Sequence, residues 1–200
     1  MRQYDEFDRV QPATGESETL EPGGYICKII SAKVEKAKEG KNYDELMKVA
    51  FDIDEGNFKG YYSRRFDRSK NYRSDAKWPG VYHQTIKQSD LRYFKGFITA
   101  IEESNPGYKW TWDESSLKGK IFGGIFGEEE YRGNDGKVRT ITKLQWVRSV
   151  GKVREGSFTI PPIKRLQRSG GASSTIPGLP PVEAYATELL PMTDEDGLPF

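Results

Sequence analysis

The segment from residue 59 to residue 78 interleaves positively charged and aromatic side chains at close spacing. Its cations are Lys59, Arg64, Arg65, Arg68, Lys70, Arg73 and Lys77, and its rings are Tyr61, Tyr62, Phe66, Tyr72 and Trp78. Cations can contact phosphates, and each nucleic-acid base that stacks on a ring adds about 1–3 kcal/mol with little dependence on the base. The pattern therefore favours a site for single-stranded nucleic acid. The alternative is that half of these rings belong to the core, as we expect for Phe66 and one of the paired tyrosines.

A second cationic segment runs from residue 137 to residue 154. Its cations are Lys137, Arg139, Lys143, Arg148, Lys152 and Arg154, and no acidic residue lies between Gly136 and Arg154. If Trp146 points outward, its ring is a stacking platform; if it points inward, it is the largest side chain of the core. The alternation along residues 138–146 leaves both orientations open. Our candidate nucleic-acid-binding residues are Lys59, Tyr61, Tyr62, Arg64, Arg65, Arg68, Tyr72, Arg73, Trp78, Lys143, Trp146 and Arg148.

Residues 192–200 form a third pattern, in which acids precede an apolar end on a segment without positive charge. The residues concerned are Asp194, Glu195, Asp196, Leu198, Pro199 and Phe200. The Phe200 ring and the terminal carboxylate can occupy an apolar pocket with a basic rim, while the acids steer the approach. We expect this tip to bind a partner protein. An ordinary acidic tail is the alternative.

Other sites that these residue types could form are incomplete. His83 is the only histidine and Cys27 the only cysteine, so a zinc ligand set cannot be assembled. Residues 52–56 begin like a calcium loop but lack the later ligands, and Gly123-Gly124 lacks the Gly-Lys-Ser/Thr of a phosphate loop. A nuclease site built on the carboxylates of residues 52–56 would need partners that nothing in the sequence identifies. We expect no cofactor, no metal and no catalytic activity.

The charges are unevenly distributed along the 200 residues, although the net charge is only +1. Residues 1–21 carry two basic and six acidic side chains, and residues 169–200 carry five acidic and no basic ones. Residues 22–168 therefore hold 29 basic against 19 acidic side chains, a net charge of +10. A basic body between acidic tails indicates a polyanionic partner. A solvated surface with disordered tails would show the same composition.

Hydrophobicity and cysteine content bear on the compartment. Apolar residues make up 35% of the chain, and no apolar run exceeds three residues, far short of the roughly 20 that span a bilayer. The N-terminus lacks the basic-then-apolar pattern of a secretory signal. Cys27 alone cannot form an internal disulfide, which is typical of a reducing compartment. We therefore expect a cytoplasmic protein without membrane contact.

The elements that must position these residues follow from hydrophobic periodicity. The expected strands cover residues 25–34, 47–53, 58–66, 120–126 and 138–150. Ser89 or Asp90 caps a helix that stops at Asn105-Pro106-Gly107, and its one apolar stripe consists of Leu91, Phe94, Phe97, Ile98 and Ile101. Residues 67–88 show no sustained period and predict a long loop. Residues 133–136 predict a hairpin turn.

Three strands, one helix and two further strands are the order of an OB-fold, a small Greek-key barrel. We therefore predict a mainly β protein: a five-stranded OB-fold-like barrel with one helix between strands three and four, followed by a disordered acidic C-terminal tail. The expected segments are a polar acidic leader at 1–23, the nucleic-acid-binding domain at 24–160, a flexible Pro/Gly/Ser linker at 161–191 and the tip at 192–200. An SH3-like barrel and a mixed α+β sheet are the alternatives.

The tip resembles the end of bacterial single-stranded DNA-binding proteins, which finish in a run of Asp followed by Ile-Pro-Phe; Gly197 is an insertion relative to that pattern. The body from Tyr4 to Val150 is similar to a family of bacteriophage-type single-stranded DNA-binding proteins of replication and recombination modules. That similarity lies in the acidic, aromatic leader and in Glu21-Pro22-Gly23-Gly24-Tyr25, Phe58-Lys59-Gly60 and Leu117-Lys118-Gly119-Lys120. The resemblance implies an OB-fold that coats single strands. It also implies a tip that docks on exonucleases, helicases, primase and recombination factors and competes with DNA for a cationic groove.

Residues and resemblance together predict a protein that binds single-stranded DNA without strong base preference during phage DNA replication or recombination. Its partners would be single-stranded DNA and, through the tip, replication or recombination proteins; it could act as a monomer or a homo-oligomer. If phage-encoded, it would act in the cytoplasm of a bacterial host. An RNA-binding OB-fold protein, a metal-dependent recombination nuclease and a structural adaptor whose tail alone is active are the alternatives.

Overall fold

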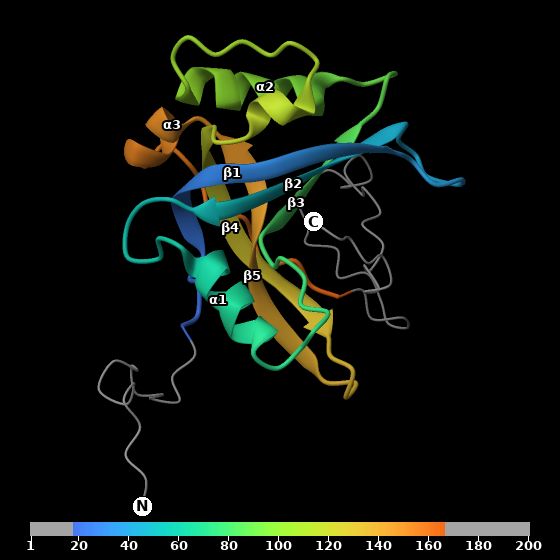
Figure 1. Cartoon of the computed structure of the whole chain (residues 1–200), viewed down its shortest axis with the longest axis vertical. Helices are drawn as coiled ribbons and strands as arrows, with labels where there is room; N and C mark the ends of the chain where they lie inside the picture. The colour runs from blue at the N-terminus through green and yellow to red at the C-terminus, as the bar shows by residue number, and fades with distance from the viewer. Residues whose placement is uncertain (1–17, 167–200) are drawn as a thin grey trace, which may run out of the picture.

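The computed structural model describes residues 18–166, which form a five-stranded antiparallel sheet with a few helices (Figure 1). The strands are β1 (Gly23–Lys36), β2 (Glu45–Ile53), β3 (Val81–Ile86), β4 (Ile121–Arg132) and β5 (Val138–Arg148). The helices are α1 (Tyr61–Lys70), α2 (Arg92–Ser104), α3 (Val150–Arg154) and the single 3-10 turn η2 (Glu114–Leu117). Helices α1 and α2 lie on opposite sides of β1 and β2 in Figure 1. The expectation of a mainly β chain is confirmed.

Period-two alternation puts the apolar side chains of β1 and β2 into the core. The residues on this inner face are Cys27 and Ile29 of β1 and Met47, Val49, Phe51 and Ile53 of β2, and all are buried. Burial also raises the pKa of the Cys27 thiol well above its usual value. The strand expected over residues 47–53 is confirmed, because one face of it is covered by the core.

The strand order is β3-β2-β1-β4-β5, and every neighbouring pair is antiparallel, so β3 and β5 are the two edges of the sheet. The register shifts once between β1 and β2, at Ile30, and once between β4 and β5. A shift of this kind is a β-bulge, which bends the strand and changes the face to which the following side chains point.

The prediction of a strand over residues 58–66 is wrong, because the chain turns at Gly60 and begins helix α1 at Tyr61. Gly60 has a φ of 72°, a conformation that glycine adopts without strain. The Asp52 carboxylate of β2 accepts hydrogen bonds from the backbone N–H groups of Tyr62 at 2.8 Å and Ser63 at 3.1 Å. These bonds satisfy the free donors of the first helical turn. The residue that caps α1 therefore lies in β2, outside the helix, so the hydrophobic pattern of residues 58–66 could not predict it.

The prediction of one long loop over residues 67–88 is wrong in part. Residues up to Lys70 complete α1, and Val81–Ile86 form β3, so the connecting loop covers only residues 71–80. Strand β3 pairs with β2 from Val81 opposite Ala50 to Ile86 opposite Glu45. The third strand of the sheet thus follows a helix rather than a turn.

The helix expected after residue 89 is confirmed as α2. The predicted stripe is buried at Phe94, Phe97, Ile98 and Ile101, and Ala100 and Ser104 are buried as well. The expected cap at Ser89 or Asp90 is wrong, because the helix begins at Arg92 after Leu91, which is 40% exposed. The Phe97 ring stacks on Tyr82 of β3 with 6.1 Å between ring centres. Asn105 ends the helix, and its side chain exchanges hydrogen bonds with the backbone of Ile121 in β4. Helix α2 therefore connects β3 to β4 through packing as well as through the chain.

The strands expected over residues 120–126 and 138–150 are confirmed, with β4 continuing to Arg132 and β5 stopping at Arg148, and the hairpin between them turns at residues 133–136. The short helix α3, which was not expected, replaces the end of the predicted last strand. It packs on β4 where Gly123 has no side chain, since a Cβ atom there would lie 2.4 Å from a methyl group of Val153. Glycine at this position is what allows the close approach.

Parts of the expected segments lie outside the described residues. The acidic leader is described only from residue 18 and the linker only to residue 166, and the whole tip at 192–200 lies beyond. Within residues 18–166, no helix is long and apolar enough to cross a membrane.

Candidate nucleic-acid interface

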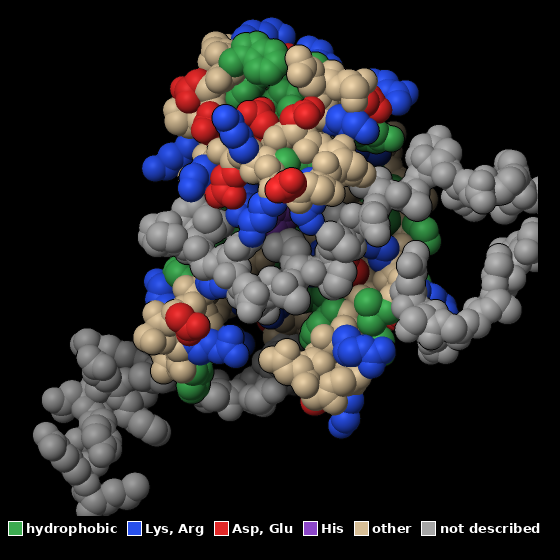
Figure 2. Space-filling view, turned by 90° about the vertical axis from the view of Figure 1, so that its right-hand side faces the viewer, with side chains coloured by type: hydrophobic (Ala, Val, Ile, Leu, Met, Phe, Trp, Pro, Cys, Tyr) green, Lys and Arg blue, Asp and Glu red, His purple; other side chains and the backbone are tan. Residues whose placement is uncertain are grey.

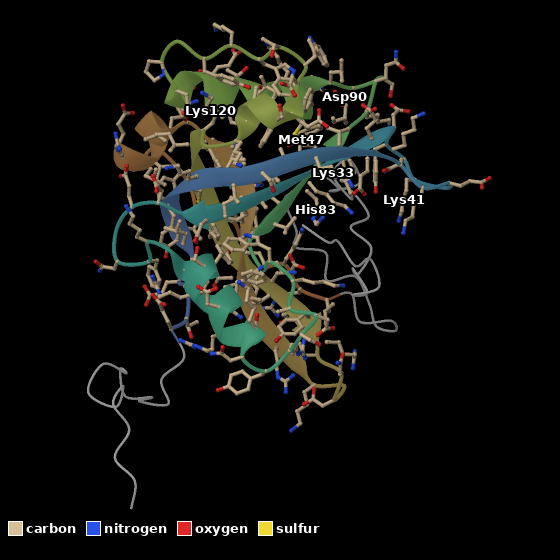
Figure 3. All side chains as sticks on the ribbon, in the orientation of Figure 1. Lys33, Lys41, Met47, His83, Asp90 and Lys120 are labelled. Carbon is tan, nitrogen blue, oxygen red and sulfur yellow. The ribbon has the colours of Figure 1, made fainter. Side chains whose placement is uncertain are left out.

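One face of β1, β2 and β3 carries a row of basic side chains that no local sequence pattern links. Lys33 lies directly opposite Lys48, and Lys48 lies directly opposite His83. Residues in such positions have Cβ atoms about 4.5–5.5 Å apart. Figure 3 shows Lys33 and His83 on one side of these strands and Met47 on the other. We call Lys33, Lys48 and His83 the basic row; in Figure 2 the only histidine, in purple, lies among Lys and Arg side chains.

Two further charged residues, Glu35 and Lys143, act on the side chains of the basic row. A carboxylate oxygen of Glu35 lies 3.5 Å from the Lys33 Nζ, and the other lies 2.9 Å from the Lys48 Nζ. Burial lowers the pKa of His83, the charges of Lys48 and Lys143 lower it further, and Glu35 opposes them. His83 is therefore neutral at pH 7 and lies in a cationic environment.

A bulge in β5 decides the orientation of Trp146. Leu144 and Trp146 pair with adjacent residues of β4, so Gln145 is the extra residue. The bulge turns Leu144 toward the core and leaves 39% of Trp146 exposed. The Arg148 guanidinium lies 5.7 Å from the centre of the Trp146 ring. The two side chains form a ring-and-cation pair of the kind that binds a stacked base next to its phosphate.

Charges on the edge strand β5 shift the pKa values of residues on the other edge strand, β3. Burial raises the pKa of Tyr82 in β3 to about 12, and the charge of Arg148 in β5 partly offsets this rise. The charge of Lys143 in β5 lowers the pKa of His83 in β3 and so adds to the effect of burial there. The positive charges of β5 therefore act electrostatically on residues of β3, including His83 of the basic row.

Tyr61 and Tyr62 lie in the core. Both are buried, and the Tyr62 ring packs edge-on against Phe51 with 5.2 Å between ring centres. The Tyr61 hydroxyl accepts a hydrogen bond of 2.7 Å from Arg65. Neither ring presents an open face to a base. We expected one of these tyrosines in the core together with Phe66; instead both are buried, and Phe66 is only half-buried.

The N-terminal half of α1 uses its cations for internal contacts. Arg64 forms an ion pair with Glu18 at 2.7 Å and also donates to the backbone carbonyl of Lys59. Arg65 lies with its guanidinium 5.4 Å from the centre of the Tyr61 ring. Lys59 is exposed in the turn that precedes the helix. These contacts tie α1 to the turn before it and to the start of the described chain.

The C-terminal end of α1 and the following loop present cations and one ring to solvent. Arg68 and Arg73 are exposed, and Tyr72 between them is 84% exposed. Trp78 has a structural role instead, because its indole N–H donates to the backbone carbonyl of Phe51 at 3.1 Å and its ring lies 5.3 Å from that of Phe66. Tyr72 is therefore the open ring of this segment.

The candidate residues thus fall into three sets. Lys143, Trp146 and Arg148 lie on β5, and Arg68, Tyr72 and Arg73 lie together at the end of α1. In the rest of the first cationic segment, Tyr61, Tyr62 and Trp78 pack into the fold, Arg64 and Arg65 are exposed but make internal contacts, and Lys59 is exposed. The basic row itself was missed. Nothing local relates Lys48 to Lys33 or His83, because strand pairing between distant segments brings them together.

Within residues 18–166, no three or more His, Cys, Asp or Glu side chains are grouped so that they could hold a metal ion. The comparisons with known proteins identify no relative: no family model matches the chain, and no curated protein matches it. Functional inference therefore depends on the basic row and its neighbours.

Proposed function

We propose that this chain is a single-stranded DNA-binding protein that coats exposed strands without strong base preference. The observation that carries the proposal is the basic row across β1, β2 and β3, whose His83 is within electrostatic reach of Lys143 on β5. Like charges directly opposite each other on neighbouring strands are destabilising. The single Glu35 carboxylate offsets only one of the two positive charges of Lys33 and Lys48, so folding stability alone does not account for the pair. A polyanion does, since its phosphates neutralise both lysines and release counterions.

We further propose that the sheet is a partly open OB barrel. The pairings of β1 with β2 and β4, of β2 with β3 and of β4 with β5 agree with the order of that fold, as does the position of α2 between β3 and β4. OB-folds bind oligonucleotides on the face of strands 2 and 3 and on the loops that join strands 1 to 2 and 4 to 5. Lys48 and His83 of the basic row lie on strands 2 and 3, Lys33 lies on the neighbouring strand 1, and Lys143 lies in strand 5.

Binding of single strands also requires aromatic rings on which bases can stack, and the exposed rings of Trp146 and Tyr72 supply them. Trp146 lies beside Arg148, and Tyr72 lies between Arg68 and Arg73, so each ring has a cation at hand for the adjoining phosphate. Bases in a duplex are already stacked on their neighbours, whereas bases of a single strand can stack on such rings. The arrangement therefore supports single strands over duplex.

Titration of tryptophan fluorescence with poly(dT), poly(rU) and duplex DNA tests this function. If about five phosphates are contacted, the logarithm of the affinity should fall with the logarithm of salt concentration at a slope near −3.5. Binding that does not change with salt would contradict the proposal. Tighter binding of poly(rU) would indicate an RNA-binding protein, and magnesium-dependent loss of a labelled strand would indicate a nuclease.

The recruitment of replication or recombination enzymes is the second part of the proposal and depends on the sequence of residues 192–200. Because the segment 169–200 carries five acids and no cation, it should compete with DNA for the basic surface. Deletion of residues 192–200 should tighten DNA binding several-fold and abolish partner binding. Phe200→Ala should abolish partner binding alone, since it leaves the charge unchanged.

A further inference from the structure

Glu35 occupies the space between the two lysines of the basic row. Its carboxylate oxygens lie 3.5 Å from Lys33 and 2.9 Å from Lys48. The Lys48 side chain is only 12% exposed, whereas those of Glu35 and Lys33 are 31% and 59% exposed. Lys48 is thus a recessed cation, and the carboxylate lies closer to the solvent side of it.

The lysine pair depends on an anion. Lys33 and Lys48 are directly opposite across β1 and β2, where two like charges repel each other. His83 follows on the far side of Lys48, and Lys143 adds a further positive charge nearby, itself paired with Glu129 at 3.4 Å. Glu35 is the carboxylate that links the two lysines, and it does so from the same strand as Lys33, two residues further along.

We propose that Lys33 and Lys48 form a phosphodiester subsite, which the Glu35 carboxylate occupies in the free protein and which a phosphate of the bound strand takes by displacing it. This inference rests on the proposed single-strand-binding function. A carboxylate and a phosphodiester both offer anionic oxygens to lysine ammonium groups, so they compete for the same two donors. The partly exposed Glu35 side chain can turn into solvent, whereas the recessed Lys48 cannot follow it.

The direction of the effect follows from this competition. Glu35 weakens DNA binding, because its contacts with the lysines must be broken and because it repels the arriving phosphate. For two unit charges about 5 Å apart in water, that repulsion alone corresponds to about a fourfold change in affinity. Glu35→Gln should therefore bind dT oligonucleotides about fourfold more tightly than the wild type.

The matched control is Glu103→Gln, which makes the same change in net charge at an exposed position of α2. Lys33→Met and Lys48→Met should each weaken binding and reduce the salt slope by about 0.7, the share of one phosphate contact. In a protein that already carries Lys48→Met, Glu35→Gln should increase the affinity for dT oligonucleotides by much less than fourfold. The reason is that the Lys48 ammonium group, for which the carboxylate and the phosphate compete, is absent. Urea denaturation of each variant separates these effects from misfolding, and the exposed Lys33 provides a variant that tolerates substitution if Lys48→Met is unstable.

A second measurement does not require DNA. His83 is the only histidine, so its imidazole proton resonances are unambiguous, and it lies directly opposite Lys48. Inorganic pyrophosphate should shift these resonances in the wild type, at lower concentration in Glu35→Gln and not in Lys48→Met.

The outcomes distinguish the subsite from the function. If dT oligonucleotides bind but Glu35→Gln behaves like the wild type or like Glu103→Gln, the subsite is refuted and the function stands. If no oligonucleotide binds while pyrophosphate still shifts His83 through Lys48, the function is refuted and the anion subsite stands. If neither ligand acts on the protein, both are refuted.

Discussion

Tyr72→Ala is the sharpest test of the aromatic part of the interface. Tyr72 is 84% exposed between Arg68 and Arg73 at the end of α1. Tyr93 on α2 is 63% exposed and lies on the other side of β1 and β2. The two tyrosines therefore form a matched pair in which only the first lies in a cationic, candidate binding segment.

The expected magnitudes follow from exposure. Loss of one stacking platform costs about 1–3 kcal/mol of binding free energy, which is about 5- to 150-fold in affinity. Only the remaining sixth of the Tyr72 surface is buried, roughly 30 Å² if a tyrosine can bury about 200 Å². At about 25 cal/mol per Å², its removal should lower the free energy of unfolding by less than about 1 kcal/mol.

Fluorescence anisotropy with labelled dT oligonucleotides measures the affinity, and urea denaturation measures the free energy of unfolding. Tyr72→Ala should bind at least fivefold more weakly with nearly unchanged stability, and Tyr93→Ala should bind like the wild type. Wild-type affinity in Tyr72→Ala would show that this ring stacks on no base. An equal loss in Tyr93→Ala would show that the aromatic contribution is not located at α1.

Three further predictions concern residues that hold or adjust the interface. Tyr62→Ala should lower the free energy of unfolding by about 3–5 kcal/mol, measured by urea denaturation, because this ring is buried against Phe51; a small loss would contradict its assignment to the core. Asp52→Ala should cost about 2 kcal/mol in the same assay, since it leaves the backbone donors of Tyr62 and Ser63 at the start of α1 unpaired; an unchanged midpoint would mean that the cap is dispensable. His83 has a lowered pKa, so between that value and the usual 6.5 the unfolded chain binds more protons than the folded one. The stability of the wild type should therefore decrease relative to His83→Gln as the pH falls through 6.5, and parallel curves for the two proteins would refute the shift.

Hydrophobic periodicity was sufficient to predict an element where one face of that element packs against the core. The strand at 47–53 and helix α2 both show it, because their apolar residues recur at the period of their own backbone. It failed over residues 58–66, where paired tyrosines and a phenylalanine look like a strand. There the decisive group is the Asp52 carboxylate, whose bonds to Tyr62 and Ser63 start a helix that no residue of the segment signals.

The candidate nucleic-acid interface also has some features that the sequence determines and others that only the tertiary structure decides. The sequence by itself determined that residues 22–168 are strongly basic and that cations alternate with rings in two segments, because composition and spacing are properties of the chain. Only the tertiary structure decided which of these side chains are available. Burial removed Tyr61 and Tyr62 from the surface, and the extra residue Gln145 turned Trp146 toward it.

The basic row is the clearest product of tertiary structure. Lys33, Lys48 and His83 belong to three strands separated by turns, a helix and a loop, and they become neighbours only through the registers of two strand pairs. A slip of one residue in either register would turn one lysine or the histidine to the opposite face. Those registers are fixed by the fit of the inner, apolar residues in the core, so the residues that pack the core also position the charges on the outer face.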